Sequence, residues 1–366
     1  MKNIVIVNGY LQIGGAEKVL TFLANLLSSY YNIYFVVLRK TQKELFKLNS
    51  NVTLIELNLE DNRVSSEEMG YMGALRYFVK TSNVLKSKFK ELNAHAVIAF
   101  NDREIILTWI SLLFQSKIKC IYSQRNAPSS KRKITNRLLR YIYAHSDGVA
   151  LQLEDVRKFY KLEKNEKCVI IENPIAVNNS PTWVEKPVKR ILAAGRLDPQ
   201  KRFDILIEAF ARFVRIHNDY ILEIYGEGYL RDELQYQISQ LNLQSMVFIH
   251  KPIPSITKEK ADSTMFVLCS DWEGIPNIIL EAMSVGIPCI VTDCDPGGGR
   301  LVTNMGECGL LIEPNNVDAL LGAMEAYVND ISLRNEKRNK AFKYIENFKE
   351  EVISQKWLDF IRNTVE

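Results

Sequence analysis

The feature that most constrains the fold of this chain is an alternation of short apolar runs with longer segments of helical periodicity. The alternation occurs twice, and a polar stretch that contains prolines, from Glu172 to Pro187, separates the two occurrences. Strands that alternate with helices typically form a parallel sheet with helices on both faces. The sequence therefore predicts an α/β protein with two doubly wound parallel-sheet domains.

Apolar runs of strand length recur on both sides of the polar stretch. In the first half, strands are expected at 2–7, 33–38, 52–57, 96–100, 118–122 and 149–151, with a helix at 16–30. In the second half, strands are expected at 190–195, 221–225, 246–249, 265–268 and 288–292, with helices at 203–216 and 230–241.

The polar stretch sets the expected domain boundaries. We place the N-terminal domain at residues 1–173 and the second domain at 174–345. A final helix at 346–366 is expected to pack back across the domain junction through apolar residues such as Trp357. Because open α/β sheets bind ligands outside the carboxyl ends of their strands, the two domains are expected to face a central cleft with these ends.

Composition is typical of a soluble globular protein. The 366 residues are 47% hydrophobic and 25% charged, which is close to average usage. No apolar run reaches the roughly 18 residues that cross a bilayer, and the first ten residues have the pattern of a strand rather than of a signal peptide. The six cysteines form no C-x-x-C pair and are expected to be reduced thiols. These features favour a cytoplasmic protein.

Charge is distributed unequally between the two halves. Residues 1–173 hold 26 Lys and Arg against 16 Asp and Glu, whereas the remainder holds 21 against 27. A basic field attracts anionic partners, such as nucleic acid, a phospholipid surface or a phosphorylated acceptor. No nucleic-acid recognition motif accompanies the charge, so nucleic acid is not an expected partner.

Four charged residues of the second half lie where a doubly wound sheet binds its ligands. Arg196 and Lys201 follow an expected strand. Glu273 and Glu281 lie on either side of an expected helix start at Pro276. Cations and helix-start N–H groups can bind the diphosphate of a sugar nucleotide, and carboxylates can accept hydrogen bonds from its hydroxyl groups. Either pair alone would be interpreted as ordinary surface charge.

The chain resembles glycosyltransferase family 4 in the order of four motifs. They are Gly14-Gly15-Ala16-Glu17, Gly195-Arg196-Leu197 with Lys201, Tyr225-Gly226-Glu227-Gly228, and Glu273-Gly274-Ile275-Pro276 running to Glu281. That family has two Rossmann-like domains in the arrangement called GT-B. The resemblance covers nearly the whole chain and is strongest from Arg190 to Ile312. It implies transfer of a sugar from a nucleoside diphosphate donor with retention at the anomeric carbon, without an essential metal or another cofactor.

The resemblance also implies roles for individual residues. Arg196 and Lys201 would stabilise the charge of the departing diphosphate, and Glu273 would contact the transferred sugar or its leaving oxygen. These three residues are the catalytic candidates. Glu281 would bind the ribose hydroxyls of the donor. The other donor-binding candidates are Gly14, Gly15, Gly274, Ile275, Asn277 and His250.

Several neighbouring features are interpreted as non-functional or stay open. The glycine pair before the helix at Ala16 can admit a phosphate, although a tight strand-to-helix turn has the same form. Arg202 is expected to face solvent. The triplet Asp293-Cys294-Asp295 mimics a metal-binding D-x-D motif, but no metal site is expected there. The glycine-rich loop that ends at Arg300 departs from the family pattern at Leu301, which leaves a role in donor binding open.

The first half supplies candidates for acceptor binding. Arg125 and Asn126 belong to a loop that resembles an Arg-Asn-x-Pro form of some bacterial hexosamine and galactose transferases, although a self-capped loop is the alternative. Lys131 and Arg132 begin a segment in which basic and apolar residues alternate at helical spacing. Such a segment fits an anionic membrane surface or a lipid diphosphate, and equally an ordinary amphipathic helix.

Together these features predict a retaining GT-B enzyme that moves a hexosyl or N-acetylhexosaminyl group from a UDP-sugar to a glycan or lipid-linked glycan acceptor. The enzyme would act in the cytoplasm, attached peripherally to the inner face of the membrane. Two alternatives remain: a UDP-sugar 2-epimerase of the same architecture, and a non-catalytic protein that binds sugar nucleotides or glycans.

Overall fold

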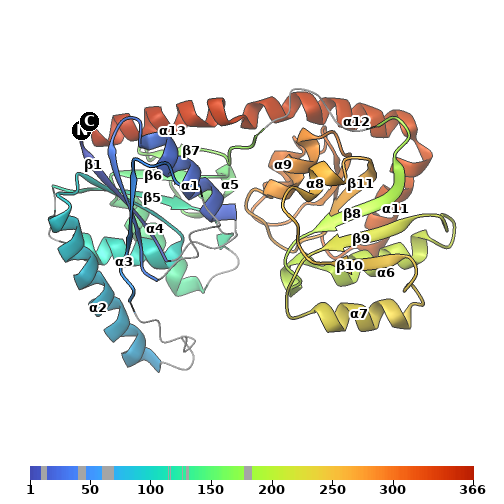
Figure 1. Ribbon diagram of the computed structural model, residues 1–366, viewed down its shortest axis with the longest axis horizontal. Coiled ribbons are helices and arrows are strands. Elements are labelled where there is room, and N and C mark those ends of the chain that lie inside the picture. Colours follow the sequence, from blue (N-terminus) through green and yellow to red (C-terminus); the bar gives the residue numbers. More distant parts are fainter. Residues whose placement is uncertain are drawn as a thin grey trace. The chain divides into compact units, whose positions relative to one another are not determined.

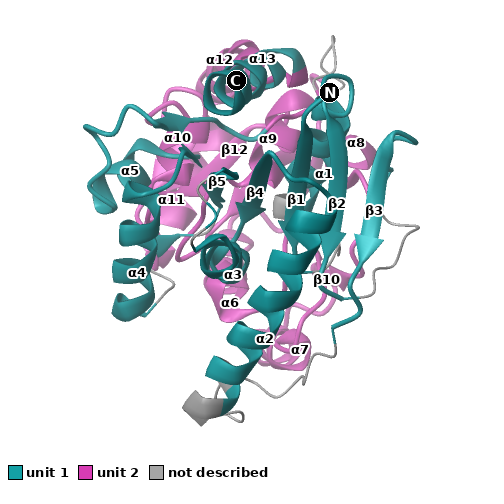
Figure 2. Ribbon diagram, turned by 90° about the vertical axis from the view of Figure 1, so that its left-hand side faces the viewer, with its two compact units in different colours: residues 1–173, 351–366 teal, residues 174–350 magenta. Residues whose placement is uncertain are grey.

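The chain forms two compact units. The structure, a computed structural model, describes residues 1–9, 15–39, 47–59, 70–113, 115, 117–125, 127–128, 132–176 and 184–366. Unit 1 comprises residues 1–173 together with 351–366, and unit 2 comprises residues 174–350 (Figure 2). The chain therefore passes from one unit to the other twice.

Unit 1 is built on a parallel sheet that lies among its helices (Figure 1). The strand order of this sheet is β3-β2-β1-β4-β5-β6-β7. The order runs outward from β1 to β3 and then resumes on the other side of β1 with β4, which makes the sheet doubly wound. Its elements are β1 (Asn3–Asn8), α1 (Gly15–Leu27), β2 (Asn32–Val37), β3 (Val52–Glu56), α2 (Gly70–Glu91), β4 (Ala96–Phe100), α3 (Asp102–Leu112), β5 (Lys119–Gln124), α4 (Lys133–Ala144), β6 (Gly148–Leu151), α5 (Glu154–Phe159), β7 (Cys168–Ile170) and α13 (Glu350–Val365).

Helices cover both faces of this sheet. Ile4 and Ile6 of β1 pack in a cluster with α1 and α13, whereas Val5 and Val7 pack on the opposite face with Leu85 and other residues of α2 and α3. All five residues of β4 are buried, as expected for a strand that is enclosed on both faces. The alternation of side chains along β1 thus divides the core of unit 1 into two layers.

Helix α13 returns the end of the chain to unit 1. Its buried stripe includes Ile353, Trp357 and Ile361, which are spaced four residues apart. The Trp357 ring stacks on Phe100 of β4 with ring centroids 6.0 Å apart and an interplanar angle of 20°. Complete burial of a large apolar side chain stabilises a fold by about 1.5–3 kcal/mol. The last helix is therefore part of the core of unit 1.

Unit 2 repeats the doubly wound plan with the strand order β10-β9-β8-β11-β12-β13. Its elements are β8 (Val188–Ala194), a 3-10 turn at Pro199–Lys201, α6 (Phe203–Phe213), β9 (Ile221–Tyr225), α7 (Arg231–Gln240), β10 (Val247–His250), α8 (Ile256–Glu259), β11 (Ser263–Leu268), α9 (Asn277–Ser284), β12 (Cys289–Thr292), α10 (Gly298–Val302), β13 (Leu310–Ile312), α11 (Val317–Asn329) and α12 (Ile331–Tyr344). Ile191, Leu222 and Met265 point to one face of the sheet, where they pack with α6 and α11.

Each strand that the sequence predicts corresponds to a strand of the structure, with ends that differ by a few residues. The sequence analysis missed β7 and β13, because each has only three residues and lacks the length of a recognisable apolar run. The second unit also extends to residue 350 rather than 345. Ile345 and Phe348 are buried in a 3-10 turn of unit 2, and the Phe348 carbonyl accepts a hydrogen bond from the Ile175 N–H at 2.9 Å.

Candidate active site

Two loops of unit 2 meet where the strand order of the sheet reverses. Strands β8 and β11 are neighbours in the sheet although β9 and β10 lie between them in sequence. The segment 195–202 follows β8, and the segment 269–276 follows β11. Ligands of open α/β sheets bind at such a switch point. The candidates Arg196, Lys201 and Glu273 all lie on these two loops.

Lys201 and Glu273 form an ion pair that bridges the two loops. The Lys201 ammonium contacts Glu273 Oε1, and the Ser270 hydroxyl donates a hydrogen bond of 2.8 Å to the same oxygen. The side chains of Lys201 and Glu273 are only 14% and 12% exposed, respectively. Because a shielded pair is screened less by water and salt than a surface pair, its electrostatic effect on a bound ligand is stronger.

Arg196 lies on the same loop as Lys201 and has a more open environment. Its guanidinium donates a hydrogen bond of 3.0 Å to Gln200 Oε1 and lies 3.2 Å from the Asp198 carboxylate. The side chain is 73% exposed, so these contacts contribute little to stability. An arginine of this kind can exchange its weak partners for two oxygens of a phosphate.

Two glycines of the Tyr225-Gly226-Glu227-Gly228 motif support the Arg196 loop. A Cβ atom on Gly226 would lie 2.0 Å from the Gly195 carbonyl oxygen, and one on Gly228 would lie 2.2 Å from the Leu197 carbonyl oxygen. The Leu197 N–H also donates to the Glu227 carbonyl at 2.9 Å. These positions require glycine because the two backbones approach too closely for any side chain.

Helix α9 follows the Glu273 loop and carries Glu281. The helix begins at Asn277, and Pro276 is its N-cap rather than its first helical residue. Ile275 is buried, whereas Asn277 and Glu281 are half-buried and lie four residues apart, on the same face of the helix. The first N–H groups of a helix have no partner within the helix and can therefore bind oxygens of an anion.

The glycine-rich start of α10, at residues 297–300, packs against the Glu273 loop. A Cβ atom on Gly298 would lie 1.6 Å from the Gly274 carbonyl oxygen, and the Glu273 N–H donates to the Asp295 carbonyl at 3.1 Å. Arg300 of α10 pairs at 2.5 Å with Asp293, which follows β12. In the part of the chain that the structure describes, no group of three or more His, Cys, Asp or Glu residues is arranged to hold a metal ion.

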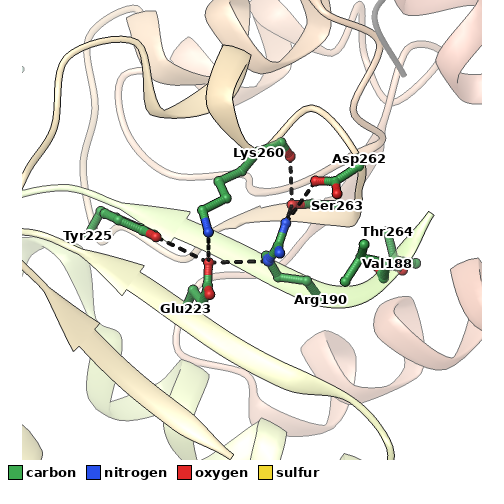
Figure 3. A network of polar contacts seen from close by, with 8 residues as sticks. All are labelled: Val188, Arg190, Glu223, Tyr225, Lys260, Asp262, Ser263 and Thr264. Carbon is green, nitrogen blue, oxygen red and sulfur yellow. Dashed lines mark hydrogen bonds and ion pairs between the residues drawn. The ribbon is translucent and has the colours of Figure 1, made fainter. Parts of the chain in front are cut away.

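His250 ends β10 and stacks on Tyr225, the last residue of the neighbouring strand, with ring centroids 4.7 Å apart. Among the described residues, no group hydrogen-bonds to the buried Nε2 atom of His250. The Tyr225 ring is held by its hydroxyl, which donates to Glu223 Oε2 at 3.2 Å (Figure 3). The Arg190 Nε and Lys260 Nζ atoms each lie 3.2 Å from the same oxygen. Two cations thus compensate the buried charge of Glu223.

The candidates of unit 1 are only partly covered by the structure. Gly15 begins α1, whereas Gly14, Asn126 and Lys131 lie outside the described residues. Arg132 is the exposed N-cap residue of α4.

Arg125, which is expected to contact donor sugar or acceptor, is buried in the structure. The side chain is 7% exposed, and its guanidinium donates to Asn173 Oδ1 at 3.0 Å and to the Ile171 carbonyl at 3.3 Å. The guanidinium carbon also lies 4.8 Å from the Phe100 ring centroid and 5.5 Å from that of Trp357. Burial lowers the pKa of Arg125 to about 9. Arg125 therefore connects the end of β5 with residues 171–173, which follow β7, and with α13.

A substitution can test this structural role. Arg125→Ala should lower the free energy of unfolding of unit 1 by about 1–3 kcal/mol, because it leaves buried acceptors without a donor. Arg125→Met should recover part of the loss through packing of its methylene groups. Thermal and urea unfolding would measure both, with the exposed Arg132→Ala as a control; an Arg125→Ala variant as stable as wild type would contradict this role.

The sequence analysis also missed the residues that hold the site in place. Arg202 does not face solvent as expected: its side chain is 23% exposed and pairs with Asp204 and Asp271. Gln200 also contacts the Glu273 loop, and within that loop Ser270 donates to Glu273. No signal in the sequence distinguishes Gln200 and Arg202 from ordinary surface residues, because their partners in the Glu273 loop lie about 70 residues away in the chain.

The sequence also does not reveal two buried carboxylates of unit 1, Glu104 in the first turn of α3 and Glu17 in the first turn of α1. Glu104 is 5% exposed and Glu17 is 9% exposed. Burial raises the pKa of both carboxyl groups, and for Glu104 the neighbouring Arg103, 3.3 Å away, acts in the opposite direction.

Comparison with known proteins gives the chain a family context. Residues 180–346 match the family described as glycosyl transferases group 1. The chain is 25% identical over 346 residues to an N-acetylgalactosamine-N,N'-diacetylbacillosaminyl-diphospho-undecaprenol 4-alpha-N-acetylgalactosaminyltransferase of Campylobacter jejuni, with 90% of each chain covered.

Two solved structures share the fold over nearly the whole chain. A sucrose-phosphate synthase from Thermosynechococcus elongatus has a TM-score of 0.82 at 15% identity and covers 99% of both chains. A complex of S. aureus TarM that contains UDP has a TM-score of 0.78 at 15% identity and covers 98% of this chain and 99% of that one. These two structures show that the chain has the GT-B fold. The match over residues 180–346 and the named relative show that it is a glycosyltransferase.

Proposed function

We propose that the enzyme transfers a hexosyl or N-acetylhexosaminyl group from a UDP-sugar to a glycan or lipid-linked glycan acceptor, with retention at the anomeric carbon. The motif pattern supports a place in family 4 of the glycosyltransferases. The observation that carries the proposal is the shielded Lys201–Glu273 pair at the switch point of unit 2, with the exposed Arg196 on the same loop.

These residues suit the chemistry of a departing nucleoside diphosphate. As the glycosidic bond breaks, negative charge develops on the diphosphate, and preorganised cations lower the energy of that state. Lys201 supplies a fixed point charge, and the Arg196 guanidinium can donate two hydrogen bonds to one phosphate. Glu273 holds the Lys201 ammonium, and we assign to it the contact with the transferred sugar. In this proposal the two cations stabilise the negative charge of the diphosphate, as a metal ion does in other enzymes.

The relatives support the choice of donor and acceptor. The Campylobacter relative is named for a diphospho-undecaprenol acceptor and an alpha linkage, and the TarM structure contains UDP. UDP-hexoses are commonly alpha-linked, so an alpha product corresponds to retention. The proposal extends this chemistry to the present chain.

Ligand-induced stabilisation tests the donor assignment. A ligand that binds only the native state stabilises it by roughly 2.7 kcal/mol at 100 times its dissociation constant. We expect UDP and at least one of UDP-glucose, UDP-galactose and their N-acetylamino forms to raise the melting temperature, and ADP and GDP to have smaller effects. Equal shifts for all nucleotides, or none for UDP, would contradict a UDP-sugar donor. Epimerised donor would instead identify a 2-epimerase, and binding without turnover a non-catalytic protein.

We further propose that α4 brings the enzyme to an anionic membrane surface on the cytoplasmic side. The buried side of the helix, which includes Leu139 and Ile142, packs within unit 1. The exposed side carries Arg132, Lys133, Arg137 and Arg140, together with Ile134 and Tyr141, which are 76% and 52% exposed. Basic residues at a helix start oppose the helix dipole, so the dipole does not explain the positive charges of Arg132 and Lys133 at this end of α4. No helix among the described residues is both long and apolar enough to span a bilayer.

Liposome binding tests this surface. Replacement of Arg132, Lys133 and Arg137 by serine should weaken binding to phosphatidylserine vesicles by roughly 1 kcal/mol per charge, with donor hydrolysis unchanged. Replacement of three exposed cations of unit 2, Arg215, Lys258 and Lys343, is the matched control and should have a smaller effect. Equal sedimentation of both triple variants with wild type, at low and at high salt, would contradict the proposal.

A further inference from the structure

Arg202 has a backbone conformation that is unusual for its residue type. It lies between the 3-10 turn Pro199–Lys201 and α6, with φ 48° and ψ 42°. This left-handed conformation is uncommon for residues other than glycine, asparagine and aspartate, and it costs free energy. Strained residues persist where surrounding contacts determine their conformation, often at functional sites. The contacts of Arg202 therefore indicate what the conformation serves.

The Arg202 side chain joins α6 to the Glu273 loop. Its Nε and NH2 atoms contact the two oxygens of Asp204, in the first turn of α6, at 3.1 and 2.9 Å. Its NH1 atom donates to Asp271 Oδ1 at 3.3 Å. Asp271 lies two residues before Glu273 in the loop that follows β11. One guanidinium thus ties the loop that carries the candidate carboxylate to the helix that follows Lys201.

The contacts of Arg202 belong to a continuous set. Gln200 accepts the Asp271 N–H on its carbonyl at 2.9 Å and donates from Nε2 to the Trp272 carbonyl at 2.7 Å. Lys201 contacts Glu273. Three consecutive residues, 200–202, therefore each contact a residue of 271–273. Arg202 forms the end of this set and is its one member with a strained backbone.

We propose that Arg202 is a positioning residue for sugar transfer: through Asp271 it holds the Glu273 loop so that the Glu273 carboxylate and the Lys201 ammonium keep their relative positions. This inference rests on the proposed function of Lys201 and Glu273. Displacement of a reacting group by about 1 Å can cost 10²-fold in rate. Loss of the Arg202–Asp271 contact should therefore reduce turnover more than it reduces nucleotide binding or stability.

Arg202→Gly separates the side chain from the backbone. Glycine adopts the left-handed conformation without strain, and the lost ion pairs are partly exposed, so the melting temperature should stay within about 3 °C of wild type. UDP release from an equimolar mixture of UDP-glucose, UDP-galactose and their N-acetylamino forms should fall about 10- to 100-fold in kcat. The dissociation constant for UDP, measured by calorimetry, should stay within about twofold. Arg202→Lys should recover part of the rate.

A matched pair of carboxamide variants identifies the contact that matters. Asp271→Asn removes the partner in the Glu273 loop, and Asp204→Asn removes the partner in α6. We expect Asp271→Asn to lower kcat as Arg202→Gly does, Asp204→Asn to stay near wild type, and the Arg202→Gly/Asp271→Asn double variant to show no additional loss.

Other results would overturn the inference. Full turnover of Arg202→Gly and Asp271→Asn, alongside an impaired Lys201→Ala, would refute the role of Arg202 alone. Equal losses in Asp204→Asn and Asp271→Asn, or a parallel fall in melting temperature and UDP affinity, would assign Arg202 to the stability of unit 2 instead. Wild-type turnover in Lys201→Ala would refute the catalytic assignment on which the inference rests.

Discussion

Replacement of Lys201 by alanine should lower kcat on the order of 10²- to 10³-fold, the typical cost of removing one group that stabilises charge in a transition state. The Lys201 ammonium is shielded from solvent and held by Glu273, so its position is fixed before the diphosphate begins to leave. Arg196→Ala should have an effect in the same range, because an arginine can bind two oxygens of the departing group. Both effects would be measured as UDP release and as sugar transfer at saturating donor.

Two controls accompany this prediction. Arg215→Ala removes an exposed cation of unit 2 that lies beyond the end of α6 and should leave kcat unchanged. EDTA should also leave the wild-type rate unchanged, since the proposal assigns the stabilisation of the leaving group to side chains. Wild-type turnover in both alanine variants, or abolition of activity by EDTA, would contradict the account.

The second large effect should separate the two glutamates. Glu273 contacts Lys201 and Ser270, close to the reacting groups in the proposed complex, so Glu273→Gln should mainly reduce kcat. Glu281 lies one turn inside α9 and is proposed to bind ribose, whose contacts change little between ground and transition states. Glu281→Gln should therefore raise the donor KM more than it lowers kcat.

Steady-state kinetics with varied donor would measure both glutamate variants, and thermal unfolding would verify that each is folded. Equal falls in kcat with unchanged KM in the two variants would contradict the separate roles of Glu273 and Glu281, even if the transferase activity is retained. A fall in kcat for Glu273→Gln that vanishes in the Lys201→Ala background would indicate that the two residues act as a unit.

The fold was predictable from the sequence because its strands are buried on both faces. The run Ala96–Phe100, for example, is apolar throughout and wholly buried, as parallel strands under helices are. The same logic failed for β7 and β13, since three-residue strands give no periodicity. A final helix that packs back through Trp357 was predicted, but its partner Phe100 was not, because Phe100 lies far away in the sequence.

The charged residues of the site were predictable from the sequence, whereas the residues that hold them in place were not. Lys201 and Glu273 follow the ends of neighbouring strands, and the structure brings them into contact. Their catalytic roles stay predictions. The burial of Arg125 was not predictable: a polar loop after a strand suggested a binding residue, and in the structure this residue packs against Phe100 and Trp357. Burial of a polar loop residue depends on distant segments, which local sequence patterns do not reveal.

The anomeric configuration of the first product tests the central claim most directly. Slow donor hydrolysis by the wild-type enzyme, in EDTA and without acceptor, can be followed by proton NMR before the released sugar equilibrates between its anomers. The account predicts that an alpha-linked UDP-sugar yields UDP together with the alpha anomer of the free sugar first, and that Lys201→Ala slows both signals equally. Initial appearance of the beta anomer, or of a 2-epimer of the donor, would contradict retaining transfer by this site.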